Sequence, residues 1–280
     1  MSVSSARASG APGRSERGLD AIVLAGGPPA PELTGSALPK AFAPLGPSTM
    51  VERVLAALSA SARIDRIVLV GPVPLPAAVA AAVGMPVAER GGLLDNLSAG
   101  LAAVGGAAPV LVAAADVPLL TAAAVAAFVD EALAADVDVA YAIVPRADVE
   151  RAAPGVRKTF VRLADGAFTG GSLVLLRPDA FARARPVVER AVGARKRPWE
   201  LARLFGAATL VGLATGRLRI AALERRAETV AGLRARAIVC RDAGVALDVD
   251  TPAMLEVVRR CLAPAAGPAG ANTPAGRSAV

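Results

Sequence analysis

The stretch AIVLAGGPPAPELTGSALPK, residues 21–40, indicates the class of fold. It begins with an apolar run typical of a buried strand, and this run leads directly into Gly26 and Gly27. Glycines in this position let backbone N–H groups approach an anion closely, because they carry no Cβ atom. The loop ends at Lys40, whose ammonium group is a point charge suited to phosphate. The stretch therefore predicts a phosphate site of the kind that a nucleoside triphosphate requires.

Short apolar runs alternate with helical patterns along the rest of the chain. Strands are expected at residues 21–25, 67–70, 109–115, 137–144, 159–163, 172–176, 237–240 and 245–249. Helices are expected after the capping box TMVE at 49–52, after Thr121, Asp179 and Glu200, near 223–233 and after Thr251. This alternation predicts a three-layer, Rossmann-like α/β fold with a mostly parallel central sheet. Ligands bind such sheets beyond the carboxyl ends of the strands.

The composition excludes several classes of mechanism. The 280 residues include no histidine, which removes Ser-His-Asp triads, HExxH zinc sites and histidine proton shuttles. The two cysteines, Cys240 and Cys261, have neither metal-ligand spacing nor a disulfide framework, so we expect reduced thiols in a cytoplasmic protein. Any chemistry must rest on carboxylates, lysine and arginine, hydroxyls and backbone groups.

Apolar residues make up 54% of the chain, yet no membrane span is expected. The two charge-free windows, 67–88 and 97–115, contain prolines or are rich in alanine and glycine, whereas a spanning helix needs about 20 strongly apolar residues. The polar N-terminus lacks the apolar core of a secretory signal. Residues 1–18 and 264–280 are small, polar and rich in proline or glycine, so we expect disordered tails around one domain at 19–263.

The net charge of +7 is concentrated in one part of the chain. Basic residues greatly outnumber acidic ones between 183 and 241, but only Trp199 and Phe205 are aromatic there. Nucleic-acid binding would require more stacking residues. We therefore expect no nucleic-acid partner, and a solvated basic face or a clamp for a phosphorylated small molecule instead.

Two carboxylates are candidates for a metal site. Asp116 follows a buried apolar run and would be poorly solvated unless a cation met it. Mg²⁺ prefers one or two carboxylates together with phosphate oxygens; the alternative is a cap for the following helix. Asp248 and Asp250 lie on one face of a segment expected to be extended, and Asp250 could instead cap the last helix.

Three further polar clusters are weaker candidates. In the segment 89–98, Gly91 and Gly92 permit close backbone approach, and Ser98 is expected to open a helix that could lie along a nucleobase. The turn TGGS at 169–172 is expected to precede the central strand, and Lys158 stands on or beside the strand before it; an acceptor pocket or a plain hairpin would explain both. The run 195–197, which begins with Arg195, is either a basic lid or a solvated run.

Taken in order, these segments resemble a known family. LAGG, LPKAFAPLG, MVERVL, LVAAADVPLL, TGGSLVLLRP and DVDTPAML, spread over about residues 19–262, are similar to the GT-A-like nucleotidyltransferases, specifically the MobA-like NTP transferases. That group includes molybdenum cofactor guanylyltransferases, cytidylyltransferases of isoprenoid synthesis and sugar-1-phosphate nucleotidyltransferases. The resemblance implies Mg²⁺-dependent transfer of NMP from an NTP, GTP or CTP, to a phosphorylated small-molecule acceptor, with release of pyrophosphate.

The resemblance also implies roles for individual residues. The nucleotide would be held by Ala25, Gly26, Gly27, Lys40, Gly91, Gly92 and Ser98. The acceptor side would include Thr169, Gly170 and Gly171, to which Lys158 and Arg195 are added for their charge. Lys40 would neutralise the α-phosphate and act with Asp116 in catalysis, and Asp116 and Asp250 would bind Mg²⁺.

One loop departs from the family pattern. The family usually has G-x-G-x-R before its P-K, and that arginine meets the β- and γ-phosphates. Here residues 26–32 read GGPPAPE, with no arginine and with extra residues before Lys40. Another cation, such as one in the 195–197 run, must then assist pyrophosphate departure, or activity is weak or lost.

Three alternatives therefore stay open. A catalytically inactive GT-A scaffold would bind a nucleotide or a partner without turnover. A glycosyltransferase is suggested by Asp248-Val249-Asp250, although this motif is late in the chain for that class. A dinucleotide-binding dehydrogenase is disfavoured, because the loop lacks G-x-G-x-x-G and its prolines prevent a helix from starting there.

Overall fold

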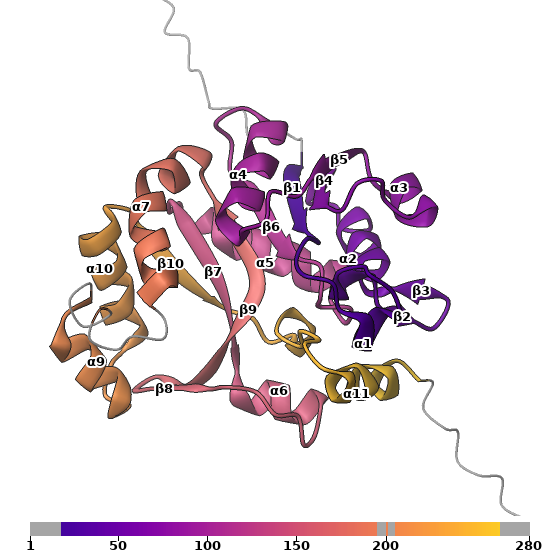
Figure 1. The fold of residues 1–280 in the computed structure, drawn as a ribbon. Helices are drawn as coiled ribbons and strands as arrows, with labels where there is room; N and C mark the ends of the chain where they lie inside the picture. Colours follow the sequence, from indigo (N-terminus) through magenta and orange to yellow (C-terminus); the bar gives the residue numbers. More distant parts are fainter. Residues whose placement is uncertain (1–17, 195–199, 201–204, 264–280) are drawn as a thin grey trace, which may run out of the picture.

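A central sheet organises the molecule (Figure 1). The structure is a computed structural model and describes residues 18–194, 200 and 205–263. The sheet runs in the order β10-β7-β9-β6-β1-β4-β5, and β8 pairs with β9. Its strands are β1 (Leu19–Leu24), β4 (Ile64–Gly71), β5 (Met85–Ala88), β6 (Val110–Ala114), β7 (Val139–Pro145), β8 (Val161–Leu163), β9 (Gly166–Leu176) and β10 (Ala235–Val239). A small hairpin, β2 (Pro44–Leu45) and β3 (Ser48–Thr49), lies apart from it.

Helices cover both faces of the sheet. The helices whose bounds the structure describes are α1 (Pro31–Thr34), α2 (Met50–Ser59), α3 (Ala77–Ala82), α4 (Leu93–Val104), α5 (Ala122–Ala134), α6 (Arg146–Ala152), α7 (Pro178–Ala194), α9 (Ala207–Ala214), α10 (Ile220–Ala231) and α11 (Pro252–Leu262), with the 3₁₀ turns η1 (Lys40–Phe42) and η2 (Ala243–Val245). On one face, Leu97 of α4 and Phe181 of α7 pack in a cluster with Ile22 of β1. On the other face, α2, α5 and α6 pack in a cluster with Val23 of β1. The expected three-layer α/β architecture is confirmed.

Most strand pairs of the central sheet are parallel, as expected. β1 lies parallel to β4 and β6, β4 to β5, and β7 to β10. The antiparallel pairs of this sheet all involve β9, which joins β6, β7 and β8. The carboxyl ends of β1, β4 and β6 consequently lie at the same edge of the sheet.

Three helix starts confirm the sequence prediction. Thr49 and Glu52 form the reciprocal capping box of α2, in which Glu52 Oε2 accepts from the Thr49 N–H at 2.6 Å. The Thr121 hydroxyl accepts from the Ala124 N–H at the start of α5. The Thr251 hydroxyl accepts from the Met254 N–H at the start of α11, where Pro252 takes the first position.

The prediction of a turn at 169–172 is wrong. These residues lie inside β9, which is 11 residues long and changes register against β7 between Tyr141 and Ile143. The reversal of the chain falls earlier, between β8 and β9. Gly171 is required here by packing, because a Cβ atom would lie 2.9 Å from Ala142 Cβ and 2.8 Å from Val245 Cγ1.

Two other local expectations are also corrected. Ser98 does not open a helix, since it lies in the middle of α4, which begins at Leu93. Residues 245–249 do not form a strand, because the Asp242 side chain accepts from the Gly244 N–H and turns the chain into η2. The expected tails and Arg195 lie outside the described residues.

No helix in the described part of the chain is long and apolar enough to cross a membrane.

Candidate active site

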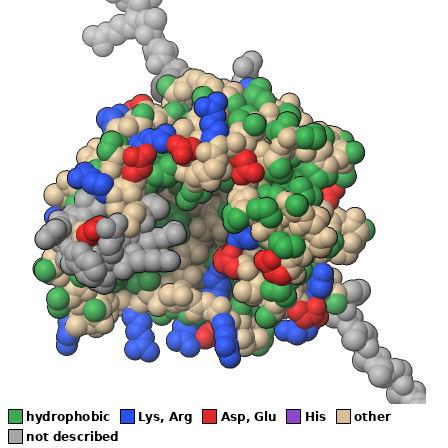
Figure 2. Space-filling model, viewed as in Figure 1, with side chains coloured by type: hydrophobic (Ala, Val, Ile, Leu, Met, Phe, Trp, Pro, Cys, Tyr) green, Lys and Arg blue, Asp and Glu red, His purple; other side chains and the backbone are tan. Residues whose placement is uncertain are grey.

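Lys40, Asp116 and Asp250 meet at the carboxyl edge of the sheet, although more than 200 positions separate the first from the last. Asp116 follows β6, and its carbonyl accepts from the Val249 N–H at 2.9 Å, which fixes the loop that carries Asp250. Lys40 Nζ lies 2.6 Å from Asp116 Oδ2 and also pairs with Asp250. Figure 2 shows a hollow at the centre of this face, with acidic and basic side chains gathered beside it.

The charges of this cluster are not balanced. The Asp116 side chain is only 16% exposed, and its Oδ1 atom has no hydrogen-bond partner among the described residues. Burial raises the pKa of Asp116, and the attraction of Lys40 offsets this only in part. Burial lowers the pKa of Lys40, but Asp116 and Asp250 outweigh it, so the net shift is upward. A hydrogen bond from Lys40 lowers the pKa of Asp250, which is 64% exposed.

Neither carboxylate caps a helix. Thr121 caps α5 and Thr251 caps α11, so the alternative that the two aspartates serve only as caps is not supported. The described residues contain no group of three or more histidine, cysteine, aspartate or glutamate side chains that could hold a metal ion. A hard cation that draws its other ligands from phosphate and water nevertheless fits two carboxylates, one of which has a buried oxygen with no partner in the described part of the chain.

The glycine loop is shaped by a carboxylate that was not among the predicted site residues. Gly27 has φ +141°, a conformation that favours glycine, and its N–H donates to Glu89 Oε2 at 2.8 Å. A Cβ atom on Gly26 would collide with the same carboxylate and lie 3.0 Å from Asn96 Nδ2. The backbone of Ala25 continues the sheet, donating to the Val70 carbonyl. We expected the Gly27 N–H to face the anion of a ligand. In this structure it already donates to the Glu89 carboxylate.

The predicted nucleobase stretch lies beside this loop. Gly91 has φ +86°, and Gly92 precedes the first residue of α4. The Arg90 N–H donates to Asn96 Oδ1 at 2.5 Å, which fixes the turn. Ser98 Oγ, in contrast, donates to the Leu94 carbonyl and accepts from Arg185 Nη1 of α7, so its side chain links two helices. The direct nucleotide contact predicted for Ser98 would require this contact to open.

A second cation–carboxylate pair lies on the predicted acceptor side. Lys158 Nζ donates to the Ala246 carbonyl at 2.6 Å and pairs with Asp248. The adjoining cavity has a volume of about 480 Å³ and is lined by Arg157, Lys158, Thr159, Thr169, Gly170, Asp248, Asp250, Thr251 and Met254. It thus includes four predicted site residues but not Gly171, which packs behind the strand.

Sequence reasoning missed Arg157. It is exposed in the cavity wall, and no described carboxylate pairs with it. Its neighbour Lys158, which was predicted, is mostly buried and already paired. The only sequence signal for Arg157 was its place next to Lys158 in VRKTF.

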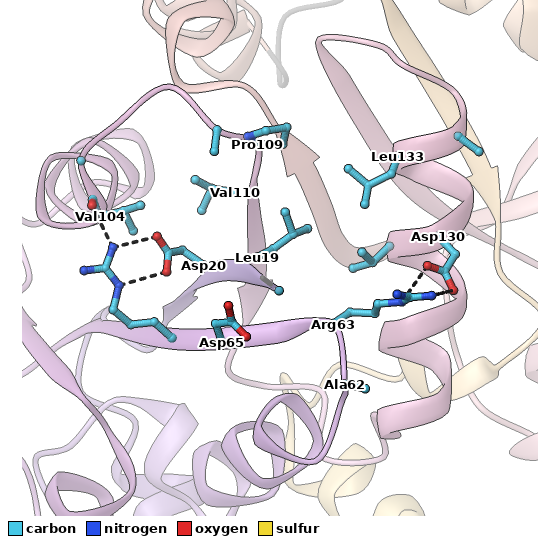
Figure 3. A pocket seen from close by; sticks show the side chains of 16 residues that line it. Leu19, Asp20, Ala62, Arg63, Asp65, Val104, Pro109, Val110, Asp130 and Leu133 are labelled. Carbon is cyan, nitrogen blue, oxygen red and sulfur yellow. Dashed lines mark hydrogen bonds and ion pairs between the residues drawn. The ribbon is translucent and has the colours of Figure 1, made fainter. Parts of the chain in front are cut away.

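The most voluminous of the described cavities lies elsewhere. It measures about 830 Å³ and opens at the amino ends of β1, β4 and β6. Figure 3 shows that two of its acidic side chains, Asp20 and Asp130, each pair with an arginine at the cavity wall, whereas Asp65 has no partner drawn. Asp20 accepts two hydrogen bonds from Arg66, and Asp130 is bridged by Arg63. Its size therefore does not mark it as the functional site.

Comparison with known proteins shows the family of the chain. The model of the MobA-like NTP transferase domain matches residues 21–199. A hypothetical transferase from Thermus thermophilus shares 41% identity and a TM-score of 0.77, covering 85% of this chain and 100% of its own. 4-Diphosphocytidyl-2C-methyl-D-erythritol synthase (19% identity, TM-score 0.53, 88% and 99% covered) and CMP:2-keto-3-deoxy-manno-octonic acid synthetase complexed with CTP (14%, 0.52, 87% and 97%) share the fold. No curated relative matches the sequence. The chain belongs to the MobA-like NTP transferase family and is a nucleotidyltransferase.

Proposed function

We propose that this nucleotidyltransferase transfers NMP from GTP or CTP to a phosphorylated small-molecule acceptor, releases pyrophosphate, and depends on Mg²⁺. The observation that carries the proposal is that Asp116 Oδ1, buried beside Lys40 and Asp250 at the carboxyl edge of the sheet, has no hydrogen-bond partner among the residues that the structure describes. A buried, unsatisfied carboxylate oxygen is costly unless a ligand uses it. The absence of histidine fits a reaction that depends on position and charge.

In the proposed reaction, an acceptor oxygen attacks the α-phosphorus of the NTP. The bond from this phosphorus to the oxygen that bridges it to the β-phosphate breaks, and pyrophosphate leaves with the electron pair. Lys40 would turn from its two aspartates to the α-phosphate, where it stabilises charge in the transition state. Arg157 and Lys158 would hold the acceptor phosphate on the other side of Asp250.

Asp116 and Asp250 would hold the Mg²⁺ ion. When bound, the ion would neutralise charge on the phosphates. Release of Lys40 from the two carboxylates would leave them available to a cation, so nucleotide and metal binding are expected to be coupled. The catalytic domain is proposed to span residues 19–263 and to work in the cytoplasm.

The test is a screen for pyrophosphate release with each of the four NTPs, a panel of small phosphorylated acceptors, and Mg²⁺ or EDTA. We expect release with GTP or CTP, and none with EDTA. Asp116→Asn should lower the rate by at least about 100-fold, the scale of a lost electrostatic contact in an active site. Asp130→Asn, the same change at the opposite edge of the sheet, is the matched control and should stay within about twofold of wild type.

Three results would contradict the proposal. An unchanged rate in Asp116→Asn would show that this residue does not hold the metal. Nucleotide binding by calorimetry, with no pyrophosphate from any acceptor, would indicate a binding scaffold. Hydrolysis of nucleotide sugars without pyrophosphate release would indicate a glycosyltransferase.

A further inference from the structure

An apolar cavity lies between the sheet and α10. It has a volume of about 410 Å³, within the range of small-molecule sites. Its walls include Tyr141 and Ile143 of β7, Val161 of β8, Phe168 of β9 and Leu223 of α10. Tyr141 and Val161 are each 41% exposed, which is unusual for such large apolar side chains in this structure. The surface therefore leaves apolar area unburied at this place.

This cavity adjoins the proposed acceptor site. Thr169 and Gly170 line both the apolar cavity and the polar cavity that contains Arg157 and Lys158. A single segment also serves both, because Lys158 lines the polar cavity and Val161, three residues later, lines the apolar one. Three residues span at most about 11 Å, so one small molecule can reach both.

Tyr141 marks the boundary between the two cavities. Its hydroxyl lies so close to Gly170 that a Cβ atom there would collide with it. Burial, and then the negative charge of Asp248, raise the pKa of the Tyr141 phenol, a group that is a neutral hydrogen-bond donor at pH 7 in any case. The ring thus faces the apolar side while the hydroxyl stands near the polar side.

We infer that the acceptor is amphipathic, with a phosphate bound at Arg157 and Lys158 and an apolar body seated between β7, β8, β9 and α10. This inference rests on the proposed function and specifies the chemical class of its second substrate. The positive side chains complement the phosphate, and the adjoining apolar wall gains free energy only from a ligand that covers it. Acceptors whose body is wholly polar would leave that wall exposed.

The test compares ethyl phosphate with n-octyl phosphate, below the concentration at which the latter forms micelles. Calorimetry on the full chain should give at least about tenfold tighter binding of octyl phosphate, because burial of two methylene groups supplies that factor. Val161→Asp and the cavity-filling Ala227→Phe, on opposite walls, should each abolish the preference while ethyl phosphate still binds. Arg157→Ala should weaken both ligands by the same factor.

Val211→Asp is the matched control. Val211 is an exposed apolar residue of α9 that does not line the cavity, so its variant should keep the full preference. Equal affinities in the wild type, or a preference that survives both wall substitutions, would overturn the inference. If pyrophosphate is released with GTP or CTP but octyl phosphate is not preferred, the inference alone fails. If octyl phosphate is preferred but no NTP is turned over with any acceptor, the proposed function fails, and the acceptor role of the cavity fails with it.

Discussion

The two edges of the sheet carry similar charged side chains, which differ in their burial and in their ion-pair partners. At the amino edge, Asp130 pairs with Arg63 where both side chains are about half exposed. At the carboxyl edge, Asp116 is mostly buried, shares one lysine with Asp250, and leaves an oxygen without a partner in the described part of the structure. The amino-edge cavity is nevertheless the larger one, at about 830 Å³ against 480 Å³.

This difference shows which property identifies a site for charged ligands. Solvent and bidentate partners satisfy the charges of the amino edge, so a ligand would gain little by replacing them. The carboxyl edge holds a carboxylate whose desolvation its partner does not fully offset. A buried carboxylate of this kind is expected where a bound ligand supplies its missing partner. While the ligand is absent, the same carboxylate lowers the stability of the folded protein.

The largest expected effect is that of Lys40→Met on turnover. The variant removes the cation proposed for the α-phosphate, so kcat for pyrophosphate release should fall by at least about 100-fold. Arg63→Met at the other edge is the matched control and should stay within about twofold. A variant that kept most of its turnover would show that Lys40 serves only as a counterion for the two aspartates.

Asp116→Asn should have opposite effects on activity and on stability. The raised pKa of Asp116 means that the folded state binds its proton more tightly than the unfolded state does, so ionisation lowers stability. This cost is fully present above the folded-state pKa and disappears as the pH falls below the ordinary value. Without nucleotide at pH 7, Tm should therefore rise by about 2–4 °C, the shift given by about 1 kcal/mol in a domain of this size.

Thermal unfolding of both proteins between pH 7 and pH 3.5 checks this sign. The advantage of the variant should shrink as the pH falls. A lower Tm for Asp116→Asn at pH 7 would show that the ion pair with Lys40 stabilises the fold, and the contrast between the two edges would then lose its basis.

The smallest effect is expected for Asp130→Asn. Exposed ion pairs contribute about 0.2–1 kcal/mol because solvent screens them. About 0.5 kcal/mol, the middle of this range, would lower Tm by about 1–2 °C, and this loss should diminish in 1 M salt, which calorimetric scans at two ionic strengths would measure. A fall in Tm as large as that caused by a core substitution would show that this amino-edge ion pair is important for the stability of the fold.

Several features of the fold follow from local sequence. The apolar run before Gly26, the capping box at Thr49 and the Thr251-Pro252 start of α11 each depend on a few adjacent residues, and the structure confirms all three. The positions of Asp116 after a buried strand and of Lys40 after the loop were readable for the same reason. Family membership followed from the order of these motifs.

Other features required contacts between distant segments. Residues 169–172 resemble a turn, but the pairing of Thr169 and Gly170 with β7 makes them part of β9. Glu89 reaches the Gly27 amide from 62 positions away, and Arg185 reaches Ser98 from 87 positions away. Hydrophobic period and capping preference describe neighbours in sequence and carry no information about such partners.

The sequence by itself determined the fold class, the glycine loop and the residue types able to handle a triphosphate without histidine. Only the tertiary structure decided that Lys40 lies between Asp116 and Asp250, and that a polar and an apolar cavity share Thr169 and Gly170. The physical reason is that charge balance and cavity shape depend on distances across the sheet, which are set when separate strands pack together.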